Sequence, residues 1–146
     1  MKYVFIPMFA LLCLAGCSSN TSTQISAKRY HDYDEIIDRT ILWMELLNQE
    51  EDFYYSYVYS PRCGHCNDIK QDVIEFALNH ESFYFIEFTS DILITDNPST
   101  TIGETDIEKV AIVGTPTLFE IYNKQIKANI AGSKNILATL TNHNSL

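Results

Sequence analysis

Two cysteines three positions apart, Cys63 and Cys66, are the residues of this chain whose type and spacing are best suited to chemistry. The segment before them, 53–59 (FYYSYVY), is aromatic and β-branched and predicts a buried strand. The segment after them, from about 64 to 79, has apolar residues on one side of a 3.6-residue period and predicts an amphipathic helix. Cys63 is therefore expected just before a helix N-terminus, where unpaired N–H groups and the helix dipole lower the pKa of a thiol. The pattern indicates a reactive dithiol.

Length and charge limit the classes of function. The 146 residues are enough for one domain and a tail. The formal charge is −9, and the ten Lys and Arg residues are scattered along the chain. Binding to nucleic-acid phosphates needs a basic face, so no nucleic-acid partner is expected.

The start of the chain is expected to be a signal peptide. Lys2 is followed by an apolar run, residues 3–15, which is too short to span a bilayer as a helix. The run ends in Leu14-Ala15-Gly16-Cys17, which resembles the lipobox of bacterial lipoproteins. The resemblance implies that residues 1–16 are removed and that Cys17 becomes an acylated first residue, anchored in a membrane by two acyl chains. A plain secretory signal with a chance cysteine is the alternative.

This processing would decide the state of the four cysteines. Cys13 would leave with the signal peptide and Cys17 would be blocked by its lipid, so that Cys63 and Cys66 remain as thiols. A purely structural disulfide is the alternative for this pair. The loop it would close is too short to constrain much of the unfolded chain, so a redox role is the better interpretation. Residues 17–30 are rich in Ser and Thr and are expected to form a tether, followed by one domain over 31–146.

Within the domain, hydrophobic periodicity and turn residues predict alternating helices and strands. In chain order we expect a helix over 34–50, a strand over 53–59, a helix over 64–79, a strand over 82–89, an irregular loop over 90–104, a short helix capped by Thr105 or Asp106 and ending near 110, a strand over 117–122, a turn at Asn123-Lys124, an antiparallel strand over 125–130 and a final helix over 134–142.

Two motifs carry a resemblance to a known family. Cys63-Gly64-His65-Cys66, followed further along the chain by Gly114-Thr115-Pro116-Thr117, resembles the thioredoxin superfamily, and the dipeptide between the cysteines is that of protein disulfide isomerase. The resemblance covers about residues 34–142. It implies an α/β, thioredoxin-like three-layer fold with a central mixed β-sheet flanked by helices, the CxxC at a helix N-terminus and a cis-Pro loop. The family's first strand is not recognisable in the sequence.

The resemblance also implies roles for site residues. Cys63 would be the nucleophile that attacks a substrate sulfur, and Cys66 would resolve the mixed disulfide. Pro116 would be cis, and the backbone of Thr115 would hold a substrate segment as an added strand. The redox-active disulfide Cys63–Cys66 would be the only redox group, with no separate cofactor and no metal.

Other residues near the cysteines modify this expectation. His65 and Arg62 add positive charge beside the Cys63 thiolate, and replacing His65 by Pro is expected to make the protein more reducing. Arg62 stands where the family usually has tryptophan, and Tyr57 stands where it often has a buried acid. Glu87 and Glu120 are candidates for an acid that assists Cys66. Three tyrosines share one face of the first strand, and one of them could line the site: Tyr55, Tyr57 and Tyr59.

Together these features predict a membrane-anchored, extracytoplasmic thiol–disulfide oxidoreductase. Its partners would be cysteine-containing protein substrates and a redox protein that re-oxidises or re-reduces the pair. Two alternatives are weaker. A zinc site would need a histidine beside Cys63 and Cys66, and no second CxxC is present to supply further ligands. The distant histidines are each interpreted as solvated: His31, His80 and His143. The second alternative is a non-catalytic adaptor that has this fold and only binds a partner.

Overall fold

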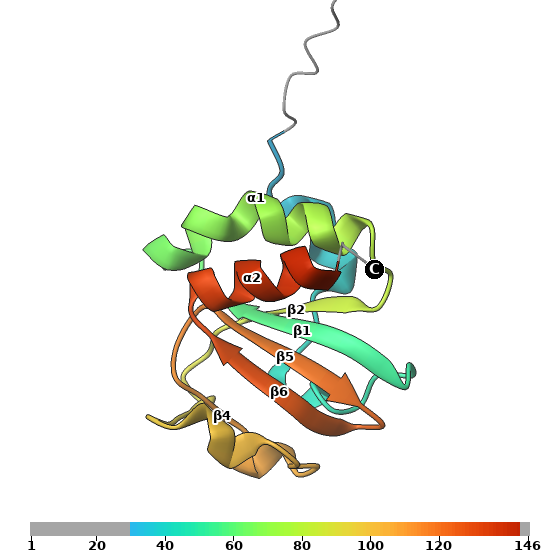
Figure 1. Cartoon of the computed structure of the whole chain (residues 1–146), viewed down its shortest axis with the longest axis vertical. Helices are drawn as coiled ribbons and strands as arrows, with labels where there is room; N and C mark the ends of the chain where they lie inside the picture. The colour runs from blue at the N-terminus through green and yellow to red at the C-terminus, as the bar shows by residue number, and fades with distance from the viewer. Residues whose placement is uncertain (1–29, 144–146) are drawn as a thin grey trace, which may run out of the picture.

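A four-stranded mixed sheet forms the centre of the domain in the computed structural model, which describes residues 30–143. Its strands stand in the order β2-β1-β5-β6 (Figure 1). β1 pairs parallel with β2, whereas the β1–β5 and β5–β6 pairs are antiparallel. The strand bounds are β1 Phe53–Tyr59, β2 Phe83–Glu87, β5 Thr117–Tyr122 and β6 Gln125–Ala131.

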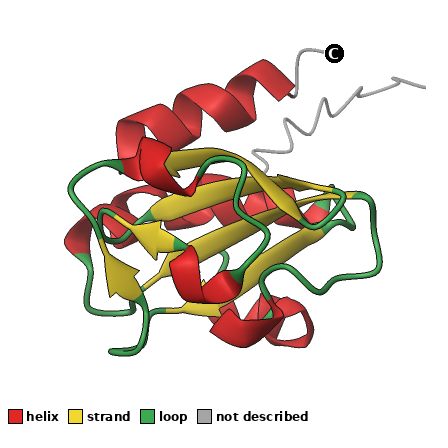
Figure 2. Ribbon diagram, turned by 90° about the horizontal axis from the view of Figure 1, so that it is seen from below, coloured by secondary structure: helices red, strands yellow, loops and turns green. Residues whose placement is uncertain are grey.

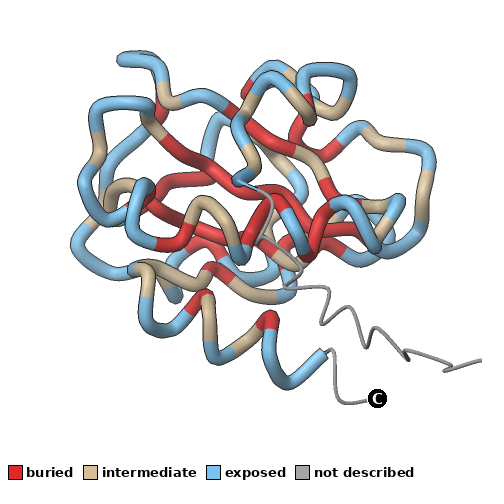
Figure 3. Tube along the Cα trace, turned by 90° about the horizontal axis from the view of Figure 1, so that it is seen from above, coloured by how far each residue is buried: buried red, intermediate tan, exposed pale blue. Residues whose placement is uncertain are grey.

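The two central strands are confirmed with the bounds that the sequence predicts, 53–59 and 117–122. All of β1 except Phe53 is buried, because both faces of the sheet are covered (Figure 3). β2 is shorter than predicted and β6 is one residue longer. Asn123 and Lys124 have φ values of 49° and 60°, which is the geometry of a type I′ hairpin turn and matches the predicted turn.

Two helices, α1 (Gly64–Leu78) and α2 (Ser133–His143), pack on one face of the sheet (Figure 1). Their apolar sides and the sheet bury the core cluster that contains Cys66, Val73, Phe85 and Ile136. Both helices are confirmed within one residue of the predicted bounds. Burial of this face fixes the start of α1, and hence the cysteine pair, against the sheet.

The predicted helix over 34–50 is wrong. The segment forms two 3-10 helices, η1 (Tyr33–Arg39) and η2 (Trp43–Glu45), with non-helical dihedrals at Ile36. Its apolar residues do not serve one face, because Ile36 enters the core under α1 while Trp43 lies in the core on the opposite face of the sheet. One straight helix could not supply both clusters.

The backbone between these two turns makes a single bridge to the edge of the sheet. Thr40 is extended and forms a single parallel bridge with Phe85 at the outer edge of β2. The N–H of Ile41 donates to the carbonyl of Phe85 at 2.8 Å. A single bridge leaves no hydrophobic alternation to detect, so the sequence does not reveal it.

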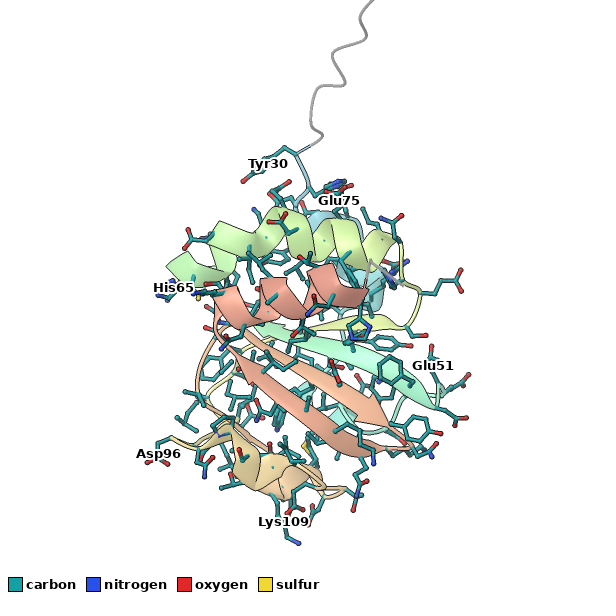
Figure 4. The ribbon with its side chains drawn as sticks, viewed as in Figure 1. Tyr30, Glu51, His65, Glu75, Asp96 and Lys109 are labelled. Carbon is teal, nitrogen blue, oxygen red and sulfur yellow. The ribbon has the colours of Figure 1, made fainter. Side chains whose placement is uncertain are left out.

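The segment 90–112 covers the second face of the sheet with short elements, as Figure 2 shows. The predicted irregular loop over 90–104 is only partly confirmed, because β3 (Leu93–Ile94) pairs parallel with β4 (Ala111–Ile112) and η3 (Pro98–Thr101) follows β3. The predicted cap at Asp106 is confirmed, and it begins the short helix η4 (Ile107–Lys109). Asp96 and Lys109 mark this side of the sheet, opposite α1, in Figure 4.

The layers together form the expected architecture of a central mixed sheet flanked by helices, with α1 and α2 on one face and 3-10 turns and a two-stranded sheet on the other. The predicted signal peptide (1–16), the lipidated Cys17 and the tether (17–30) lie outside the described residues, apart from Tyr30. Among residues 30–143 no helix is long and apolar enough to cross a membrane.

Candidate functional site

The turn between β1 and α1 places Cys63 at the helix start. Its N–H donates to the carbonyl of Ser60 at 3.0 Å, and its own carbonyl accepts from Asn67 inside α1. Cys63 is the N-cap residue, with extended backbone, and its sulfur accepts the N–H of Cys66 at 3.2 Å. The sulfur therefore occupies the place where a helix N-terminus supplies unpaired N–H donors.

This environment favours the thiolate of Cys63. Partial burial opposes ionisation, but hydrogen bonds from the side chains of Cys66 and Thr115 and from the N–H groups of Cys66 and His65 outweigh it. They lower the pKa of Cys63 below its ordinary value. Cys63 is half-buried, so its sulfur remains accessible to another molecule.

Cys66 has the opposite character. It is fully buried in the core beneath α1, and both cysteines are free thiols in this structure. Burial, together with its hydrogen bond to Cys63, raises the pKa of Cys66 to about 11. The pair therefore contains one thiol that ionises more readily than an ordinary cysteine and one that holds its proton to higher pH.

The loop before β5 completes the site. The Thr115–Pro116 peptide bond is cis, as expected from the resemblance. The thiol of Cys63 donates to the carbonyl oxygen of Thr115 at 3.3 Å, although the two residues are 52 positions apart. The loop is held in place by the Thr117 hydroxyl, which donates to the carbonyl of Gly114 at 2.7 Å. The fold therefore brings together Cys63, Cys66 and Thr115.

His65 lies at the exposed start of α1 (Figure 4). Its side chain is 78% exposed, and its Nδ1 lies 3.6 Å from Asp68 Oδ2 on the next turn. The group of this residue that lowers the Cys63 pKa is its backbone N–H. The electrostatic role of the imidazole stays a prediction.

The two carboxylates considered for Cys66 lie near tyrosines. Glu120 pairs with His143 at 3.7 Å. Burial raises the pKa of Tyr55 and of Tyr59, and the charge of Glu120 raises that of Tyr55 further, as the charge of Glu87 does for Tyr59. Neither is among the groups that shift the pKa of Cys66.

Two tyrosines lie near Cys66, and one of them is Tyr57, which stands where the resemblance implies a buried acid. Tyr57 is fully buried, and a charge on Cys66 acts on its hydroxyl. Tyr33 belongs to the same environment, and no pattern in the sequence indicated its place there. The stacking of Tyr33 on Tyr59 joins η1 to β1. No local sequence pattern predicts a contact between residues so far apart in the chain.

The interpretation of the distant histidines as solvated is wrong for His31 and His80. The side chain of His31 is 13% exposed and lies 3.2 Å from Glu35, and its backbone exchanges hydrogen bonds with Gln71 of α1. The ring of His80 stacks on Phe76 with the centroids 3.7 Å apart. His31 has partners because the chain before η1 packs against α1, and His80 has one because its ring folds back over the last turn of α1. Within residues 30–143 no group of three or more His, Cys, Asp and Glu residues is placed to hold a metal ion.

Neither protein-family models nor curated protein sequences match this chain. Solved structures do. Thioredoxin 3 from the mitochondria of Saccharomyces cerevisiae is 17% identical, with 73% of this chain and 93% of that chain covered and a TM-score of 0.48. Thioredoxin from Plasmodium falciparum is 13% identical, with 72% and 98% covered and a TM-score of 0.47. Thioredoxin f from spinach chloroplast is 11% identical, with 76% and 91% covered and a TM-score of 0.46.

Proposed function

We propose that this protein is a thiol–disulfide oxidoreductase that acts on the cysteines of other proteins through Cys63 and Cys66. The observation that carries the proposal is the asymmetry of the pair. Cys63 is accessible, capped by helix N–H groups and low in pKa, whereas Cys66 is buried and has a pKa raised to about 11. A structural disulfide needs no such difference, but a nucleophile and its resolving partner do.

The chemistry runs in two exchange steps. The thiolate of Cys63 attacks one sulfur of a substrate disulfide, and the other substrate sulfur leaves as a thiolate and takes up a proton. Cys66 then loses its proton and attacks the Cys63 sulfur, which releases the second substrate thiol and forms the Cys63–Cys66 disulfide. The substrate gains two electrons and the protein loses two. The reverse sequence donates the disulfide to a substrate dithiol, and a redox partner protein restores the starting state.

Substrate binding is assigned to the loop around the cis proline. Cys63 contacts the carbonyl of Thr115, so a substrate cysteine that bonds to Cys63 also reaches this backbone. We propose that Thr115 and Pro116 hold the substrate as an extended segment by main-chain hydrogen bonds. Main-chain recognition of this kind accepts many sequences, as a general protein oxidoreductase requires.

A direct assay tests this function. The purified protein in a glutathione buffer is given a protein substrate with scrambled disulfides, and recovery of the native substrate is followed. Wild-type protein is expected to accelerate recovery, and Cys63→Ser is expected to abolish the acceleration. An uncatalysed rate with wild-type protein would refute the proposal. Alkylation of the two cysteines in intact cells then gives the direction, because an oxidised pair indicates a disulfide donor and a reduced pair an isomerase or reductase.

The cellular location is part of the proposal. The segment Leu14-Ala15-Gly16-Cys17 supports an extracytoplasmic protein anchored through the lipid on Cys17. In a bacterial host labelled with a fatty acid, the wild-type chain is expected to incorporate the label and Cys17→Ala is expected to lose it. Equal labelling of the two chains would remove the lipoprotein assignment and leave the redox assignment intact.

A further inference from the structure

Three buried tyrosine hydroxyls on the α1 side of the sheet have no hydrogen-bond partner among the described residues: Tyr33, Tyr55 and Tyr57. Leaving a buried hydroxyl unpaired destabilises the folded state relative to pairing it. Such groups are rare in folded proteins, and each one calls for an explanation. A phenylalanine would fill the same space without that cost.

Two of the three hydroxyl groups belong to a stacked group beside the cysteines. The ring of Tyr33 stacks on Tyr59 with the centroids 4.0 Å apart, and Tyr57 lies parallel to Tyr59 at 6.2 Å. Tyr57, Tyr59 and Cys66 belong to one buried cluster, against which Tyr33 and Cys63 pack. η1, β1 and α1 therefore all contribute side chains to the cluster that contains Cys66.

The electrostatics separate these two tyrosines from the third. Burial raises the pKa of Tyr57 and of Tyr33 far above the usual range, and negative charge on Cys66 raises both further. Tyr57 and Tyr33 also affect each other's pKa. Burial raises the pKa of Tyr55 to about 12, and the second cause is Glu120, not a cysteine. Tyr57 and Tyr33 are therefore coupled to Cys66, and Tyr55 is not.

Cys66 needs such neighbours because its proton has no direct way out. Its side chain is fully buried, and it must lose a proton before its sulfur can attack Cys63. The neighbours that shift its pKa are Cys63, Ser60 and Thr115, and none of these is a carboxylate base.

We infer that the hydroxyl groups of Tyr57 and Tyr33 are the route by which the proton of Cys66 reaches solvent in the resolving step. The inference rests on the proposed function and assigns the residues that serve its second exchange. Tyr57 receives the proton of Cys66 on its oxygen and passes its own hydroxyl proton to Tyr33. Neither hydroxyl is hydrogen-bonded to another described residue in this structure and the hydroxyl of Tyr33 is buried, so both transfers need a small movement of these side chains, after which Tyr33 passes a proton to water. Each tyrosine ends neutral, the Cys66 sulfur bonds to Cys63, and the substrate thiolate leaves.

High tyrosine pKa values suit this role. A phenol that stays protonated at neutral pH does not act as a resident base, but it accepts one proton while it gives up another. The other titratable groups around the relay are Cys63 and Lys70 from α1, with the Lys70 Nζ 5.5 Å from the centre of the Tyr33 ring. The remaining titratable groups are Tyr59 of β1, which affects the pKa of Tyr33, and Glu87, whose charge adds to the effect of burial on the pKa of Tyr59.

A chromogenic aromatic disulfide separates the two exchanges. Reduced protein mixed with Ellman's reagent releases one thionitrobenzoate when Cys63 attacks and a second when Cys66 resolves the adduct. Tyr57→Phe and Tyr33→Phe are expected to leave the first release unchanged. They are expected to slow the second at pH 7 by about a hundredfold, the low end of what positioned proton transfer contributes, and to shift its pH profile upward.

Tyr55→Phe is the matched control, because it removes an equally buried and unpartnered hydroxyl from the same strand. It is expected to leave both releases and their pH profiles at wild-type values. Unfolding midpoints of all three variants report any general change in packing. Equal effects in all three variants, or a wild-type profile in Tyr57→Phe, would overturn the relay. Failure of the wild-type protein to release the second thionitrobenzoate would instead refute the proposed function, and the relay with it.

Discussion

Cys63 and Cys66 have opposite acid–base properties although only two residues separate them. The helix start and Thr115 favour the Cys63 thiolate, whereas burial holds the proton on Cys66. One turn of helix is enough to produce this difference, because the N-cap residue faces the helix N–H groups while the residue three positions on faces the core. The division of labour between the two thiols follows from their positions on α1.

His65 offers a way to separate the two sources of the low Cys63 pKa. His65→Ala removes the imidazole and keeps the N–H that acts on Cys63, whereas His65→Pro removes both and still fits the first turn of a helix. We expect the Cys63 pKa to rise in both variants, and to rise more with proline. The pH dependence of the alkylation rate measures it.

A higher Cys63 pKa also makes the protein more reducing. Each unit of pKa corresponds to about 1.4 kcal/mol, and this energy corresponds to about 30 mV in the potential of a dithiol. A proline variant with an unchanged potential in glutathione buffers would show that neither group of His65 stabilises the thiolate.

The sequence was sufficient to predict the cysteines, their helix and the approach of Thr115, because each depends on a local pattern or on a motif. It was not sufficient to predict Tyr33. The position of that ring depends on how η1 folds back over β1, and the stacking partner Tyr59 is distant in the chain. The same folding gave His31 its partners.

Among the elements, strands and long helices were predicted well and the covering segments poorly. β1 and β5 have the predicted bounds because their residues are continuously apolar or aromatic. The expected helix over 34–50 counted Ile37 and Met44 as core residues, but these are 74% and 61% exposed. Periodicity cannot distinguish one helix from two short turns that supply opposite faces of a sheet.

A buried amide helps to anchor the segment 90–112 to the sheet, in addition to the backbone hydrogen bonds of Gly103 and Glu104 with Ile126. Asn129 of β6 donates to the Thr101 hydroxyl at 2.8 Å and to the Ala111 carbonyl at 2.9 Å. Asn129→Ala leaves both acceptors without this donor, so we expect the free energy of unfolding to fall by about 1–3 kcal/mol. Hydrogen exchange is expected to accelerate over residues 93–112 and to stay unchanged in α1.

Asn135→Ala is the control for this variant, since the amide of Asn135 donates to one carbonyl at the surface. We expect its effect to stay within about 0.5 kcal/mol. If Asn129→Ala is as stable as this control, the amide does not anchor the segment.

At the scale of the whole molecule, the two cysteines make stability depend on pH in opposite directions. The folded pKa of Cys63 lies below its ordinary value of 9.0, so the reduced protein gains stability as the pH rises through that folded pKa toward 9.0. The folded pKa of Cys66 is about 11, above its ordinary 9.0. Between pH 9.0 and about pH 11 the folded state holds more protons than the unfolded state, so the stability falls as the pH rises.

Urea unfolding of the reduced and oxidised proteins across this range tests the prediction. The oxidised protein lacks both titrating thiols and serves as the reference at each pH. We expect the stability of the reduced protein, relative to this reference, to be greatest near pH 9 and to decline by roughly 2 kcal/mol toward pH 11. A continued rise up to pH 11 would mean that Cys66 is not held in its protonated form by the fold.

The central claim is that Cys63 attacks and Cys66 resolves, and trapping with oxidised glutathione at neutral pH tests it most directly. Cys66→Ser keeps the nucleophile and removes the resolving thiol, so it is expected to accumulate one glutathione on Cys63, located by mass spectrometry. Cys63→Ser keeps only a buried, protonated thiol and is expected to form no adduct on that timescale. Equal adduct formation by both variants would contradict the assignment of roles to the two cysteines.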